Sequence, residues 1–209
     1  GKNGIAKILS TATISAVVAI IGIILRMACK RSVHKNIGNI MLGFAILMTG
    51  MQTMSGAVSP LKDSPTFTNM LTMFSNPLAG ILVGILFTAV LQSASATVGV
   101  LQALSVTGIL TFASAFPIVL GIGVGAACPV LISAIGAKKN AKRAAFVHLY
   151  FNIIGTILFM VVFYTLNAFM HFAFLGTAAN AAGIAVIHSV FNVVATVCLL
   201  PFHRLLEKL

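Results

Sequence analysis

The chain has 209 residues, of which 59% are hydrophobic and only 7% are charged. Its mean hydropathy of +1.11 excludes an ordinary soluble domain and predicts a polytopic membrane protein. The formal net charge is +11, but the basic residues occur in short clusters between apolar runs, a pattern typical of cytoplasmic loops. We therefore expect membrane lipid around the chain and no nucleic acid as a partner.

The sequence contains little that could serve a catalytic mechanism. Its two acidic residues, Asp63 and Glu207, both lie at the ends of apolar segments. The three cysteines show neither metal-ligand spacing nor a disulfide framework, and there is no glycine-rich loop of the nucleotide-binding type. We therefore expect a protein that is not an enzyme and that carries no cofactor.

Six apolar units follow one another and predict an all-α fold with about five membrane-crossing helices. The units cover residues 11–28, 37–58, 76–110, 113–135, 144–169 and 182–202. The first unit is similar to the apolar part of a signal peptide, but it lacks a convincing cleavage site, so we interpret it as a membrane helix. We expect one transmembrane domain over residues 1–209. Its predicted parts are a leading helix in residues 1–36, a repeat in residues 37–143 and two further helices in residues 144–209.

The third unit, residues 76–110, decides the predicted topology. Each half holds roughly 15 residues, which makes about 22 Å of helix against a hydrocarbon core of about 30 Å. We therefore expect a re-entrant hairpin with its tip at Gln92 to Thr97. Ser75 is expected to cap the first arm, and Pro77 suits the first turn of that arm.

The basic residues bear on this topology, because loops rich in Lys and Arg face the cytoplasm. They form three clusters: Arg26, Lys30, Arg31 and Lys35; Lys138, Lys139, Lys142 and Arg143; and Arg204 and Lys208. A hairpin returns to the side from which it came and leaves all three clusters on one face, with only Lys2, Lys7 and Lys62 opposite. A complete double crossing satisfies the same rule. We expect a multi-pass protein of the inner (cytoplasmic) membrane.

The fourth unit, residues 113–135, is irregular, because three glycines and a proline fall between Gly121 and Pro129. One interpretation is a broken helix whose unwound backbone is buried in protein or faces a cavity. The other is close packing of the helix against a neighbour through small residues. Glycine at alternate positions suits both interpretations.

The motif Gln92-Ser93-Ala94-Ser95-Ala96-Thr97 places one amide and three hydroxyls within an apolar stretch. Polar groups at membrane depth usually line a pathway or bind a solute; the alternative is that the hydroxyls bond back to their own helix. At a hairpin tip one helix end attracts a cation and the other attracts an anion, as in secondary transporters. No Lys or Arg lies at this depth, which favours cation-coupled symport.

This motif resembles the Gln-Ser-Ser-Ser motif of the type II sodium/phosphate cotransporters, in their bacterial branch. The resemblance covers nearly the whole chain. It continues through Ser133 to Ala145, His148 to Thr156, His188 to Asn192 and Leu200-Pro201-Phe202. It implies sodium-driven uptake of inorganic phosphate through two inverted repeats, whose re-entrant hairpins meet at the substrate site.

We expect five side chains to bind the substrate, and three of them to hold sodium as well. The substrate set is Gln92, Ser93, Ser95, Thr97 and Asn152, and the sodium set is Gln92, Ser93 and Ser95. Asn152 enters this set from a His-x-x-Phe-Asn pattern that occurs at His148 and again at His188. We expect each histidine near the start of its helix, packed and hydrogen-bonded, with Asn152 closer to the cavity.

The chain departs from the family pattern in two ways. It has one hairpin motif where the family has two, so it resembles the second repeat, one half of an inverted-repeat transporter. Either the first repeat is missing from this chain, or a second copy of the chain supplies the other hairpin. The family also carries Asn-Ile-Gly-Thr in its broken helix, where residues 123–126 are Gly-Val-Gly-Ala, and Ala94 replaces the middle Ser of the hairpin motif.

Two further functions stay open at this point. A chain without its full cation site could conduct anions passively, without coupling to sodium. A non-transporting structural or regulatory half-protein is the other possibility. The sodium dependence of uptake separates the first from symport, and dimerisation without bound phosphate would support the second.

Overall fold

The computed structural model describes residues 11–203 and divides the chain into two units, Gly1–Ala57 and Val58–Leu209. Within the described residues all the regular elements are helices, apart from an isolated antiparallel bridge between Thr111 and Ala178. The basic residues Lys2, Lys7, Arg204 and Lys208 lie outside the described residues.

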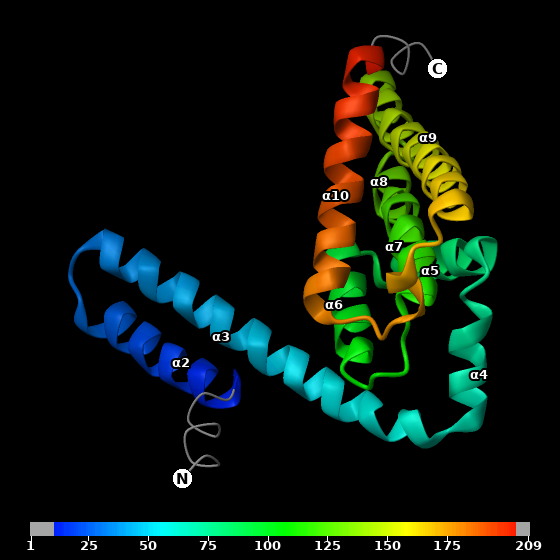
Figure 1. Cartoon of the computed structure of the whole chain (residues 1–209). Coiled ribbons are helices and arrows are strands. Elements are labelled where there is room, and N and C mark those ends of the chain that lie inside the picture. Colours follow the sequence, from blue (N-terminus) through cyan, green and yellow to red (C-terminus); the bar gives the residue numbers. More distant parts are fainter. Residues whose placement is uncertain (1–10, 204–209) are drawn as a thin grey trace. The chain divides into compact units, whose positions relative to one another are not determined.

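The first unit is a pair of helices, α2 (Thr11–Ala28) and α3 (Ser32–Val58), which lie side by side in Figure 1. They approach closely where two glycines meet. A Cβ atom added at Gly22 would lie 3.0 Å from the carbonyl oxygen of Gly38, and one added at Gly38 would lie 2.7 Å from that of Gly22. Small residues therefore set the distance between these two apolar helices, as they do in membrane helix pairs.

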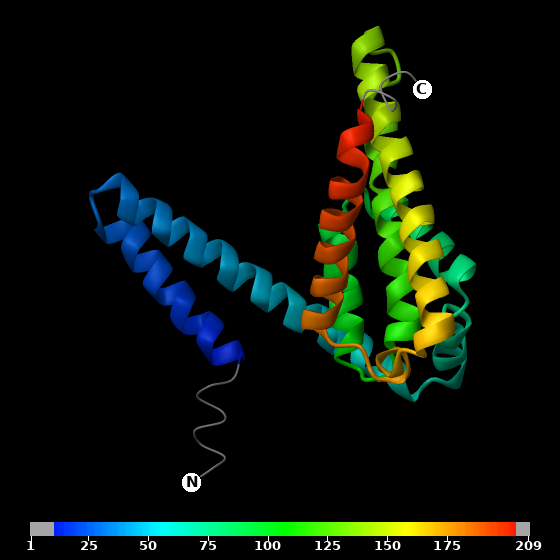
Figure 2. The same cartoon turned by 45° about the horizontal axis from the view of Figure 1, so that its top comes forward.

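The second unit contains the remaining elements. They are η1 (Ser59–Asp63), α4 (Pro65–Met73), α5 (Pro77–Leu91), α6 (Ala94–Ser105), α7 (Phe112–Gly125), α8 (Ala127–Ser133), α9 (Lys139–Met170), η2 (Ala173–Gly176), α10 (Ala181–Leu199) and η3 (Leu200–Phe202). In Figures 1 and 2, α9 and α10 run beside α7 and α8, and α6 lies beside the first half of α10. Most of α7 is buried, so α7 is the centre of this unit.

Four described helices are long and apolar enough to cross a membrane: Ser32–Leu61, Phe112–Ser133, Lys139–Met170 and Ala181–Phe202. A fifth span results if α4 and α5, which meet at an angle of 107°, are taken together. Helices α2 and α6 are apolar but shorter. The expected all-α fold of a polytopic membrane protein is confirmed.

The third apolar unit forms two helical arms, α5 and α6, joined at Gln92 and Ser93. The hairpin begins and ends at the same end of the second unit. Ser75, just before α5, shares a hydrogen bond of 2.9 Å with the hydroxyl of Ser114 on α7. Gln102, in the last turn of α6, donates from Nε2 to the Ala181 carbonyl at the start of α10, at 2.9 Å.

The cap of α5 differs from the prediction by one residue. The side chain of Asn76 accepts hydrogen bonds from the N–H groups of Leu78 and Ala79, at 3.0 and 3.3 Å. Pro77 occupies the first helical position, so the capping position falls on Asn76 and Ser75 lies outside the helix.

The glycines of the fourth apolar unit lie inside a helix. α7 continues through Gly121 and Gly125 and is interrupted only at Ala126, before α8 begins. A Cβ atom added at Gly121 would meet the carbonyl oxygen of Ile81, and one added at Gly84 would meet that of Ile118. The structure therefore favours close packing over an extended unwound stretch, and the break is limited to one residue.

Candidate functional site

The hairpin tip is a sharp reversal made without glycine. Gln92 ends α5 in the left-handed conformation (φ 54°, ψ 25°), and its N–H donates to the Thr88 carbonyl at 2.7 Å. Ser93 is extended and caps α6, because its hydroxyl accepts the N–H of Ala96 at 3.2 Å. A helix C-terminus and a helix N-terminus are thus separated by only two residues.

The polar groups at this tip are accessible. Gln92 and Ser95 are exposed and Ser93 is half-buried, and the two serine hydroxyl oxygens lie 3.3 Å apart. The N–H groups of Ala94 and Ser95 make no hydrogen bond within the described residues. Together with the serine hydroxyls they form a set of neutral donors at the positive end of α6. The structure brings the hydroxyls of Ser93 and Ser95 together, and exposed Gln92 directly precedes them in the chain.

Thr97 lies on the other side of α6. It is only 2% exposed, and its hydroxyl donates to the Ser93 carbonyl at 3.0 Å. A hydroxyl bonded to its own helix in this way needs no external partner. The structure places the Thr97 hydroxyl against the backbone of Ser93 and away from exposed Ser95.

Asn152 lies on α9 and is 6% exposed. Its Nδ2 donates to the His148 carbonyl at 2.9 Å, and its Oδ1 lies 2.7 Å from where a Cβ of Gly123 would be. The Asn152 amide thus occupies the space that a side chain at position 123 would need. Within the described residues no hydrogen bond joins Asn152 to the hairpin tip.

We expected His148 and His188 near the starts of their helices, but both lie well inside them. α9 already begins at Lys139, far ahead of His148, and α10 begins at Ala181, far ahead of His188. The repeated pattern has a repeated hydrogen bond, because Asn192 donates from Nδ2 to the His188 carbonyl at 2.7 Å. A prediction that follows only the apolar residues starts the fifth helix too late, at residue 144 in place of Lys139, whereas the start predicted at residue 182 lies next to Ala181.

Thr88 is a polar residue near the tip that the sequence pattern did not single out. Its side chain is fully buried on α5, and its hydroxyl has no hydrogen-bond partner among the described residues. The Thr88 Cβ lies 2.7 Å from where a Cβ of Gly125 would be. A threonine one helical turn before Gln92 was the available signal, since residues four apart share a helix face.

The charge around the tip is low. No Lys or Arg occurs between Lys62 and Lys138, or between Arg143 and Arg204. The elements from α4 to α8 therefore offer no positive side chain to an anion. Any anion bound at the tip depends on neutral donors, on helix ends and on cations bound beside it.

Comparison with known proteins identifies relatives of this chain. The family model described as Na+/Pi-cotransporter matches residues 57–189. The protein YqeW of Bacillus subtilis (strain 168) is 28% identical over 142 residues, which cover 68% of this chain and 46% of that protein. Sodium-dependent phosphate transport protein 2B of Homo sapiens is 28% identical over 123 residues, 56% of this chain and 17% of that protein.

A third relative is sodium-dependent phosphate transport protein 2A of Rattus norvegicus. It is 32% identical over 129 residues, 54% of this chain and 19% of that protein. The chain thus spans less than half the length of these relatives. No solved structure matches it. Because the family model covers more than half of its 209 residues, the chain belongs to the Na+/Pi-cotransporter family.

Proposed function

We propose that this chain supplies one half of a site at which inorganic phosphate crosses the cytoplasmic membrane together with sodium. The observation that carries the proposal is the hairpin tip, where the end of α5 and the start of α6 lie two residues apart. Exposed Ser95 and half-buried Ser93 stand at this junction. The names of two relatives, sodium-dependent phosphate transport proteins 2A and 2B, suggest the substrate and the coupling ion.

Phosphate fits the start of α6. The unpaired N–H groups of Ala94 and Ser95 and the serine hydroxyls are donors that suit phosphate oxygens. Hydrogen bonds to a charged group contribute about 1.5–3 kcal/mol each. Several such bonds are needed, because an unpaired anion in the membrane interior is very costly.

Sodium fits the end of α5. The carbonyls of Ala89, Val90 and Leu91 accept no hydrogen bond outside the helix from the described residues, and they lie in its last turn, where the helix dipole is negative. The Gln92 side-chain carbonyl belongs to the next residue. Sodium at this end offsets the charge of the anion in a region without Lys or Arg, which is the physical reason for coupling the two solutes.

A second surface must complete the site. One tip provides donors on one side of a phosphate, and its exposed polar groups cannot face lipid without cost. The relatives are more than twice as long as the matched segment. We favour a separate first repeat over an antiparallel second copy of the chain as this surface. An inverted copy would carry its basic clusters on the wrong side of the membrane.

The test is phosphate uptake into vesicles from cells that express the whole gene product. Uptake should require an inward sodium gradient and should fall in Ser95→Ala. Ser105→Ala is the matched control, since Ser105 lies on the same helix and donates to the Gln102 carbonyl at 2.7 Å. Equal uptake in potassium would favour a passive channel, and equal uptake in Ser95→Ala would remove the tip from the mechanism.

A further inference from the structure

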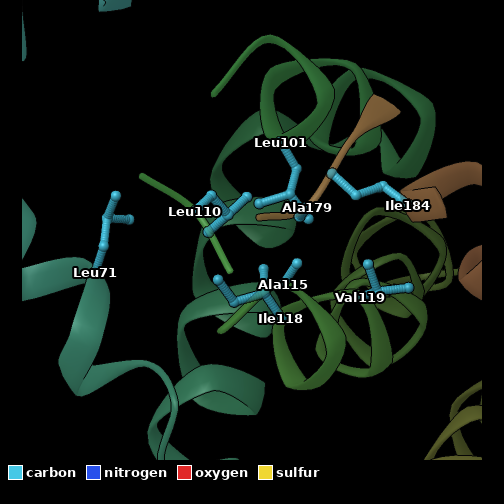
Figure 3. Packing of buried hydrophobic residues seen from close by; sticks show 8 residues of the cluster. All are labelled: Leu71, Leu101, Leu110, Ala115, Ile118, Val119, Ala179 and Ile184. Atoms are coloured by element: carbon cyan, nitrogen blue, oxygen red, sulfur yellow. The ribbon is translucent and has the colours of Figure 1, made fainter. Parts of the chain in front are cut away.

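An apolar cavity of about 330 Å³ lies between α4 and the two arms of the hairpin, and neither Ser93 nor Ser95 is among the described residues that line it. α4 forms one wall through Phe67 and Leu71, and both hairpin arms contribute, α5 through Val83 and α6 through Leu101. In Figure 3, Leu71 stands on α4 apart from Leu101 and the other core side chains. The volume falls within the range of small-molecule sites.

The lining allows only one class of occupant. Thr97 is the one polar residue among the described residues that line the cavity, and its hydroxyl already donates to the Ser93 carbonyl. A polar ligand would lose its hydrogen bonds to water and gain none here. Water is excluded for the same reason, because a buried water needs two or more polar partners. The occupant is therefore a hydrocarbon.

The cavity opens where hydrocarbon is available. Its rim includes Leu61, Met70 and Phe87, all of which are exposed. Leu82 and Leu86, on the outward face of α5, are exposed as well, and in a membrane protein such a face meets lipid. Leu61 belongs to η1, which begins at Ser59 and ends at Asp63. Polar residues thus flank Leu61 along the chain, as polar and apolar residues adjoin at the boundary between headgroups and acyl chains.

We propose that this cavity binds one acyl chain of a membrane phospholipid. An empty space of this size costs free energy in proportion to its volume, and acyl chains are the apolar molecules present at its mouth. The chain would contact α4 and both hairpin arms at once. It would thereby stabilise the position of the hairpin against α4 and leave the tip at Gln92 to Ser95 free.

The absence of tryptophan from the chain allows a direct test. A single Phe67→Trp substitution places a fluorophore in the cavity wall, and phosphatidylcholine brominated in its acyl chains quenches tryptophan on contact. In detergent, we expect quenching to saturate when lipid and protein are about equimolar, because such sites are few per protein. Met70→Trp at the rim serves if Phe67→Trp does not fold.

Two reference positions define the alternatives. Phe169→Trp, 80% exposed on α9, should follow the proportion of brominated lipid in the micelle without saturating. Phe116→Trp, 3% exposed, should stay unquenched. A fluorescence signal from position 67 like that of position 169 would mean surface lipid only, and one like that of position 116 would mean that protein fills the space. Either result overturns the proposal.

A matched pair of substitutions on α5, each added to Phe67→Trp, tests the location. Val83→Phe fills the cavity and should abolish the saturating phase of the quenching at position 67. Val90→Phe adds the same atoms to the same helix at a position that is 80% exposed, and it should leave the quenching unchanged. Equal loss in both variants would overturn the assignment to this cavity. The measurement needs neither phosphate nor sodium, so it stands or falls separately from the proposed function.

Discussion

The shaft of the hairpin, which is the part of α5 that packs on α7, differs from the tip at residues 92–95 in how closely it is packed. Along the shaft, α5 packs on α7 so closely that a Cβ at Gly84 or Gly121 would meet the backbone of the other helix. At the tip, Gln92 and Ser95 are exposed, and the first N–H groups of α6 lack partners among the described residues. The face of α5 that meets α7 is closely packed, while hydrogen-bonding groups at the tip are left without partners among the described residues.

Small residues thus serve two purposes in the hairpin: close packing along α5 and hydrogen bonding at the tip. The glycines allow backbones to touch and hold the hairpin rigidly against α7. The serines carry hydrogen-bonding capacity that the fold uses only in part. A rigid arm that presents unsatisfied donors is the arrangement that a binding site requires, because preorganised groups lose less entropy when the ligand arrives.

The clearest all-or-none difference is expected in cysteine labelling, which reports the side of the membrane on which each loop lies. Both ends of the hairpin lie at one end of the second unit, whereas α7 and α8 lead the chain away from that end. In a cysteine-free background, Lys62→Cys and Thr177→Cys should label from outside, and Lys139→Cys from the cytoplasm. Labelling of positions 62 and 139 from the same side would exclude a hairpin that returns to its own side.

A methyl group in the shaft should be nearly as disruptive. Gly84→Ala or Gly121→Ala forces α5 and α7 apart, because the new Cβ meets a backbone carbonyl that cannot rotate away. Overpacking of this kind costs about 3 kcal/mol, which lowers Tm by roughly 6–12 °C in a chain of this size. Thermal unfolding in detergent measures the change.

Two other glycines provide the control for this experiment. No atom lies within 4 Å of a Cβ added at Gly43 or Gly50 on α3. Alanine there should raise stability by about 0.5–1 kcal/mol, the usual gain in a helix interior. If all four variants lose stability alike, the shaft is not specially packed.

The helical fold was predictable because its signal is physical and local. Long apolar runs specify membrane helices, and a run such as residues 76–110 is too long for one crossing and too short for two. The place of the reversal was also predictable, since polar residues interrupt the run at Gln92. The starts of some helices were harder to predict. Polar residues such as Lys139 already belong to α9, and a search for apolar runs leaves such residues out.

The site could be predicted only in part. The motif predicted the polar tip at Gln92, Ser93 and Ser95, but Thr97 shares that motif and faces away from Ser95, because residues two apart in a helix do not share a face. Thr88 was overlooked, because its spacing of four residues from Gln92 is the one signal that this hydroxyl offers in an apolar run. The choice between a broken and a packed helix at Gly121 needed the position of α5, which is a tertiary contact that no local signal contains.

A smaller effect is expected at the tip, on binding alone. Ser95→Ala removes a hydroxyl that the fold does not need and should weaken phosphate binding by about 1–3 kcal/mol, or about 5- to 150-fold in Kd. Ser93→Ala should weaken binding similarly, but it also removes the cap of α6 and should cost about 1 kcal/mol of stability. Binding and unfolding must be measured on both variants. Loss of stability in Ser95→Ala as well would mean that the serines serve the fold.

The smallest change in stability is expected where glycine replaces a residue with positive φ, and it should separate backbone strain from a role in phosphate uptake. Gln92 and His171 are the non-glycine residues with positive φ among those described, at 54° and 46°, and both end a helix. Glycine relieves this strain, which costs about 1–2 kcal/mol, less the extra flexibility that glycine gives the unfolded chain. We therefore expect Gln92→Gly and His171→Gly each to raise Tm by a few degrees at most. Only Gln92→Gly should reduce sodium-dependent phosphate uptake, because its side chain stands at the tip while His171 follows α9. Normal uptake in Gln92→Gly would show that the protein tolerates this strain for a reason other than presenting the glutamine amide.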